Sequence, residues 1–167
     1  MSTAIYKPHT VIADTAVSDV AWNLTTTPWS RDNHMCSTVS PLTAVSHASG
    51  DMLGTASTGA LLWSNYSATA TPTGTVTGIE VWVYVHKKHR DHTVQLRLNG
   101  SAVGHNRANQ QSSNYHTYGG AGDMWGTSLA FSDMPNLSVC TRFQSGTRPH
   151  SDVCFVDSVW LQIHYTA

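Results

Sequence analysis

Strict alternation of apolar and polar residues marks the second half of the chain. Within residues 77–87, one face of the repeat is aliphatic and the other polar or aromatic, and the two rows are Ile79, Val81, Val83, Val85 and Glu80, Trp82, Tyr84, His86. A period of two sustained over this length predicts a long β-strand. Residues 93–99 repeat the pattern and end at Asn99-Gly100, a dipeptide typical of hairpin turns.

Two further strands are predicted at residues 137–144 and 153–165. The apolar row of the last one is interrupted by Asp157. A carboxylate on a buried face needs hydrogen-bond donors. We therefore expect either a β-bulge that re-aims Asp157 or backbone N–H groups that hold it.

The first seventy residues are less regular. Short strands are predicted at 10–13, 20–23 and 60–67, and the polar stretch 37–59 is predicted to be a long surface excursion. Residues 1–8 show no periodicity, so we expect an arm that orders only on a neighbour. The single domain thus divides into residues 1–30, an N-terminal arm with the first short strands, and residues 31–167, a β-sandwich.

Composition strengthens the case for an all-β fold. Ser and Thr supply 40 of the 167 residues, and Glu80 is the single glutamate. These are poor ingredients for helices. Several strands around one core predict a two-sheet antiparallel β-sandwich of jelly-roll type.

Charge, hydropathy and cysteine content argue against nucleic-acid binding, membrane insertion and metal binding. The net charge is −1, which offers no basic excess for nucleic acid. The longest apolar run, residues 81–85, is far short of the roughly 20 residues that span a bilayer, and no signal peptide is recognisable. Cys36, Cys140 and Cys154 show no C-x-x-C spacing and are interpreted as thiols. We expect no cofactor, no metal, no membrane and no nucleic-acid partner.

The sequence offers only weak candidates for a catalytic or ligand-binding site. His86, His89 and His92 recur every three residues, but in a hairpin loop with Lys and Arg between them they are interpreted as solvated. Ser158, His164 and Asp157 lack a G-x-S-x-G elbow, so we expect no enzyme.

The glycine-rich segment 118–126 invites two interpretations. As a phosphate cradle it lacks the lysine of a P-loop. We therefore favour a turn in which Asp123 hydrogen-bonds its own backbone and Trp125 packs as a lid over one end of the sandwich.

Outward-facing aromatics carry the strongest functional signal. Trp82, Tyr84 and Trp160 lie opposite the aliphatic rows of their strands. They could pack inside the protein, form an oligomer or capsid interface, or stack on sugar rings. Trp29 and Tyr6 join them as candidate interface residues. Charged residues make up only 11% of the chain, which favours a surface covered by partners.

Four segments also carry a family resemblance, most distinctively Tyr-Gly-Gly-Ala-Gly-Asp-Met-Trp-Gly, and they span residues 78–83, 94–100, 118–126 and 156–165. Together they resemble a recurrent small jelly-roll structural protein of tailed bacteriophages. The resemblance implies a virion protein, made in the host cytoplasm, that decorates or cements the capsid by bridging subunits of the major capsid protein as a dimer or trimer. The alternative is a carbohydrate- or receptor-binding module of a tail appendage.

Overall fold

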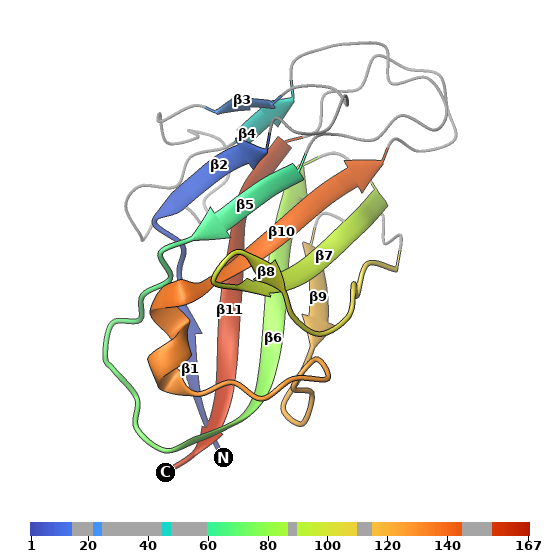
Figure 1. Cartoon of the computed structure of the whole chain (residues 1–167). Coiled ribbons are helices and arrows are strands. Elements are labelled where there is room, and N and C mark those ends of the chain that lie inside the picture. The colour runs from blue at the N-terminus through green and yellow to red at the C-terminus, as the bar shows by residue number, and fades with distance from the viewer. Residues whose placement is uncertain (15–21, 25–44, 48–59, 87–89, 110–114, 145–154) are drawn as a thin grey trace.

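The computed structural model describes residues 1–14, 22–24, 45–47, 60–86, 90–109, 115–144 and 155–167. Within them the chain forms two antiparallel β-sheets packed face to face, with both termini at one end of the molecule (Figure 1). A short 3₁₀ helix, η1 (Phe131–Asn136), leads into one of the central strands. The predicted all-β, two-sheet sandwich of jelly-roll type is confirmed.

The first sheet has six strands. Their order across the sheet is β3 (Trp22–Leu24), β4 (Val45–His47), β11 (Phe155–Thr166), β6 (Thr75–His86) and β9 (Tyr115–Gly119). The sixth strand, β1 (Ser2–Tyr6), pairs with the part of β11 that β4 leaves open. The second sheet has the order β2 (Thr10–Asp14), β5 (Ala60–Ser64), β10 (Leu137–Gln144), β7 (Arg90–Leu98) and β8 (Ser101–Ala102).

The core lies between the sheets and is built from the predicted apolar rows. On β6 and β11 the inward residues are fully buried, namely Ile79, Val81, Val83, Val159, Leu161 and Ile163. The facing sheet contributes Leu61, Trp63, Val94, Leu96 and Val139. Strand alternation therefore identified the core face of the central strands correctly, because side chains of a strand point to opposite faces in turn.

The irregularity predicted at Asp157 is present. Val156 is opposite Val85, and the next pair is Ser158 opposite Tyr84, so one residue of β11 is left over. A β-bulge of this kind re-phases the strand. The row resumes inward at Val159, and the side chain of Asp157 lies outside the described residues.

The structure corrects two expectations about the N-terminal half. Residues 2–6 are not an arm, because they form β1 and pair with β11 from Ser2↔Tyr165 to Tyr6↔Leu161. The alternation there spans only five residues, Ser-Thr-Ala-Ile-Tyr, so it left no clear hydrophobic signal. The stretch 37–59 is not wholly a surface excursion, because β4 lies within it and pairs with β11.

The glycine-rich turn behaves as predicted. Asp123 Oδ1 accepts the Trp125 backbone N–H at 2.8 Å, and the Trp125 indole N–H donates to the Ile79 carbonyl at 2.9 Å from a fully buried ring. Gly119 has φ 89°, and a Cβ there would lie 2.1 Å from the Ile79 carbonyl oxygen. Only glycine fits this approach of backbone to backbone.

A buried polar cluster joins the two sheets. Asp91 on β7 is fully buried and faces His116 and Tyr118 on β9. The His116 Nδ1 atom lies 2.5 Å from Asp91 Oδ2, and the Tyr118 hydroxyl donates to the same oxygen. Burial, followed by the neighbouring Asp91 carboxylate, raises the pKa of Tyr118. Such a cluster fixes the relative position of the sheets, because each group would be costly to bury alone.

Candidate interaction surface

Two tryptophans stand side by side on the outer face of the six-stranded sheet. Trp82 of β6 and Trp160 of β11 are directly opposite each other in the strand register. Their rings stack with centroids 6.5 Å apart and an angle of 18° between the ring planes. Both side chains are half-buried, although no second layer of the described structure covers this face. Cross-strand aromatic pairs of this kind stabilise a sheet while keeping apolar area at its surface.

A lysine completes this surface. Lys7, at the end of β1, places its Nζ atom 4.3 Å from the centroid of the Trp160 ring. An ammonium over an indole face is attracted by the negative face of the ring. Partial burial lowers the pKa of Lys7. We call Lys7, Trp82 and Trp160 the aromatic patch.

A polar row flanks the aromatic patch on the same two strands. Gln162 donates to Glu80 Oε2 at 3.2 Å, and His164 Nε2 lies 3.4 Å from the same oxygen. Glu80 and Gln162 are opposite each other in the register, so the row continues the outer face directly from the tryptophan pair. Its carboxylate and amide groups offer both hydrogen-bond donors and acceptors beside an apolar surface, whereas His164 is itself buried.

A shallow groove borders the other side of the patch. It encloses about 310 Å³ and is lined by Ile5, Lys7, His9, Ser67, Ala68, Thr69 and Trp160. His9 Nε2 and the Ser67 hydroxyl lie 2.5 Å apart at its rim. The patch is thus continuous with a concave strip along β1.

The predicted interface residues divide into three groups. Trp82, Tyr84 and Trp160 share the outer face and are half-buried, so the hypothesis that they pack between the sheets is wrong. Tyr6 is wrong as an interface residue, because alternation along β1 turns it inward, where it is 5% exposed. Trp29 lies outside the described residues.

Sequence reasoning missed Lys7, Glu80 and Gln162 as members of this surface. Lys7 lies in a segment without periodicity, and the pairing of β1 with β11 brings it to Trp160. Alternation places Glu80 on an outward face, and the register of β6 and β11 makes Gln162 its neighbour. Strand alternation gives the face of each residue, whereas neighbours across strands follow from the register.

Of the three residues considered for catalysis, only His164 has a described side chain, and those of Asp157 and Ser158 lie outside the described residues. His164 contacts Glu80 and Gln162. Within the part of the chain that the structure describes, no three His, Cys, Asp or Glu residues are grouped as metal ligands. Cys140 is buried in β10, as a small core residue. Among the described segments, no helix has the length and apolar character needed to cross a bilayer.

Comparisons with known proteins identify no family. No protein-family model matches the sequence, and no curated protein matches it. Among solved structures, the chain is similar to the native structure of a family 35 carbohydrate-binding module from Clostridium thermocellum, with 12% identity, a TM-score of 0.39, and coverage of 99% of this chain and 100% of that one. The fold described above rests on this chain's own strand pairing.

Proposed function

We propose that the protein is a non-enzymatic structural protein of a phage particle that decorates or cements the capsid by bridging subunits of the major capsid protein. The virion setting comes from the resemblance of the segments within residues 78–165. The observation that supports a docking role is the aromatic patch, which presents stacked indole rings and a lysine on a sheet face that no second layer of the described structure covers.

The chemistry of the patch favours a protein partner. Tryptophan is enriched at the energetic centres of protein interfaces, where it fills desolvated pockets. One face of the Trp160 ring is covered by Lys7, and Trp82 stacks beside it, so the pair presents ring edges and half-buried apolar area. With 11% charged residues in the chain, its surface has few ionic groups to desolvate on docking.

The proposed mechanism is avidity. A rigid sandwich that self-associates as a small symmetric oligomer would carry one aromatic patch per copy. Each contact with the shell needs only modest affinity, because linked sites bind with a high effective concentration once the first is engaged. The protein would thereby hold neighbouring capsid subunits together.

The test uses the full chain and shells of the major capsid protein encoded in the same genome. We expect the chain to co-sediment with assembled shells at a fixed ratio and Trp160→Ala to weaken this binding at least about tenfold, as for an interface hot spot. The matched control is Ile12→Ala, because Ile12 is an exposed apolar residue on the five-stranded sheet.

Three results would contradict the proposal. If the wild-type protein does not co-sediment with the shells, the capsid role is wrong. If Trp160→Ala and Ile12→Ala weaken binding equally, the aromatic patch is not the surface that binds the shell. A genome with no capsid gene near this one argues against the capsid setting before any protein is made.

A carbohydrate-binding or receptor-binding module of a tail appendage is the second candidate, and the polar row favours it. Glu80, Gln162 and His164 place hydrogen-bonding groups beside the tryptophan pair, which is a combination that sugars require. A glycan array with wild type and Trp82→Ala separates the two functions. Binding to a defined sugar that is lost in Trp82→Ala would replace the capsid proposal.

A further inference from the structure

Among the described residues, the edge of β1 that faces away from β11 is open along most of its length. Lys7 and Ser67 exchange two backbone hydrogen bonds, of 2.9 Å and 3.0 Å, so the peptide groups of Lys7 point away from β11. Alternate residues of a strand direct their N–H and C=O groups to the same side. The groups of Ile5 and Thr3 therefore point to this edge as well.

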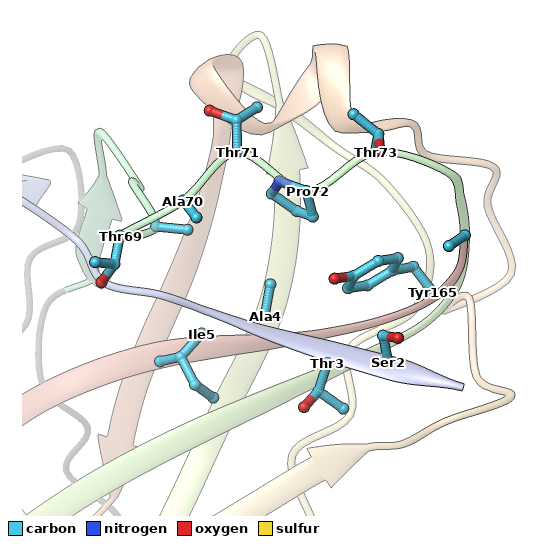
Figure 2. Close-up of a pocket in the computed structure, with 12 residues that line it drawn as sticks. Ser2, Thr3, Ala4, Ile5, Thr69, Ala70, Thr71, Pro72, Thr73 and Tyr165 are labelled. Carbon is cyan, nitrogen blue, oxygen red and sulfur yellow. The ribbon is translucent and has the colours of Figure 1, made fainter.

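No described segment takes up those groups. Among the residues that the structure describes, no backbone hydrogen bond extends the pairing from Ser67 to Ile5 or Thr3. Beyond Ser67 the chain instead passes over β1 as the segment Thr69 to Thr73, and a groove of about 460 Å³ separates the two (Figure 2). The side chains of Ala4 and Tyr165 point into this groove (Figure 2).

Residues 2–6 themselves carry no charge, proline or bulge, and a groove separates them from the segment Thr69 to Thr73. Edge strands of monomeric proteins are commonly blocked by charged residues, proline or a bulge. Residues 2–6 read Ser-Thr-Ala-Ile-Tyr and pair with β11 in continuous register. The first lysine and proline come only at positions 7 and 8. No charged side chain lines the groove.

We propose that a second copy of this chain pairs with this edge, antiparallel and about a two-fold axis at Thr3. In that register Thr3 faces Thr3 of the second copy, and Ile5 faces its Met1. The alternation of open backbone groups is then self-complementary, as a two-fold interface requires. The pairing stops before Lys7, whose edge Ser67 already occupies.

Side chains support this register. Met1 is 79% exposed, Ile5 is half-buried, and both stand on the outer face with Thr3. The pairing would place Met1 of one copy against Ile5 of the other, which removes apolar area from water. The added strand would also close the open side of the groove over Ala4. Two six-stranded sheets would become one continuous sheet.

This dimer extends the proposed function. It rests on that proposal only for the expectation that copies of the chain associate. A dimer of this form places two aromatic patches on the same face of the joined sheet, with Lys7 of each copy just beyond the paired strands. Its test needs no capsid shells, so failure of the dimer and failure of the capsid proposal are separate results.

Sedimentation of the isolated full chain, over a range of concentrations, tests the dimer. We expect a monomer–dimer equilibrium in which Thr3→Pro raises the dissociation constant at least about tenfold, because proline removes both N–H donors of the symmetric Thr3 pair. Thr3→Val keeps the N–H group and is expected to dimerise like wild type. Proline is tolerated on a strand edge whose N–H faces solvent, so the monomer should fold.

Hydrogen exchange gives a second measurement that needs no variant. The amides of Thr3 and Ile5 should exchange more slowly in concentrated wild-type protein than in dilute protein, whereas those of Ala4 and Tyr6, which face β11, should be protected in both. A monomer at every concentration overturns the proposal. A dimer that Thr3→Pro leaves intact, or that Trp160→Ala abolishes instead, also overturns it.

Discussion

The two faces of β6 and β11 differ in what they bury and in what their residues do. On the inner face, aliphatic side chains such as Val81 and Leu161 are fully buried against the other sheet. On the outer face, Trp82 and Trp160 remain half-buried with polar neighbours. The strands are the same, so the difference comes from alternation alone. We expect inner residues to determine stability and partly exposed outer residues, such as Trp160, to contribute mainly to binding. Each prediction below tests that division.

The largest loss of stability is expected from the buried polar cluster of Asp91, His116 and Tyr118. Replacing Asp91 by Ala leaves His116 and Tyr118 buried without their shared acceptor. Breaking a buried pair in this way costs about 3 to 5 kcal/mol. Urea unfolding measures the change in the free energy of unfolding. Asp91→Asn keeps the shape and an acceptor oxygen, so it should lose less. Equal small losses for both variants would show that the cluster does not join the sheets.

Adjacent residues of β11 give the most direct comparison. Leu161→Ala removes fully buried side-chain atoms and should cost about 3 kcal/mol. Trp160→Ala removes a half-buried ring and an aromatic pair and should cost about 1 kcal/mol. Both values come from the same denaturation experiment. If Trp160→Ala proved the more damaging, the outer ring would be a structural element rather than a surface for partners.

The sequence predicted the inner face well and the outer site only in part. β10 was predicted with its observed bounds, and the rows from Ile79 and Val159 onward point as expected. Both successes rest on alternation within one strand. The aromatic patch needs Lys7 over Trp160 and Trp82 opposite Trp160, which depend on the register between strands that are far apart in sequence.

The dependence on pairing between distant strands also explains why residues 1–8 were wrongly predicted to be an arm. Ser2 to Tyr6 contains one large apolar residue that points inward, Tyr6, so its alternation is too short to predict a strand. β1 is held in place by the edge of β11 that β4 leaves open, from Leu161 to Tyr165. When a strand forms mainly because a neighbouring strand offers free backbone groups, its own sequence need not show a strand pattern.

Alkaline pH is expected to destabilise the inner side through its tyrosines. Tyr66 is buried and its hydroxyl donates to the Val159 carbonyl, and burial raises the pKa of this hydroxyl well above 10.0. The unfolded chain then loses protons that the folded chain keeps, so stability is full below about pH 10 and falls as pH rises further. The loss approaches about 1.4 kcal/mol per pH unit for one such tyrosine.

Urea unfolding at pH 8 and at pH 11 measures this effect. Tyr66→Phe removes the titrating group, so it should lose less stability between the two pH values than wild type does. Its own cost at pH 8 is a lost hydrogen bond, about 1 kcal/mol. A pH dependence identical to that of wild type would assign the alkaline effect to other groups.

The smallest effect is expected at Lys7, and it tests whether the aromatic patch is organised before any partner arrives. An ammonium over a ring at the protein surface contributes about 0.5 to 1 kcal/mol. Lys7→Gln should therefore lower the free energy of unfolding by about 0.5 kcal/mol, and the same change in a Trp160→Ala background should have almost no effect, because the ring is gone. A double-mutant cycle from four denaturation curves measures this coupling. Lys7→Arg keeps a cation above the ring and should retain most of it. If Lys7→Gln has the same effect with and without the indole, the contact does not organise the outer face, and the division between the two faces depends on alternation alone.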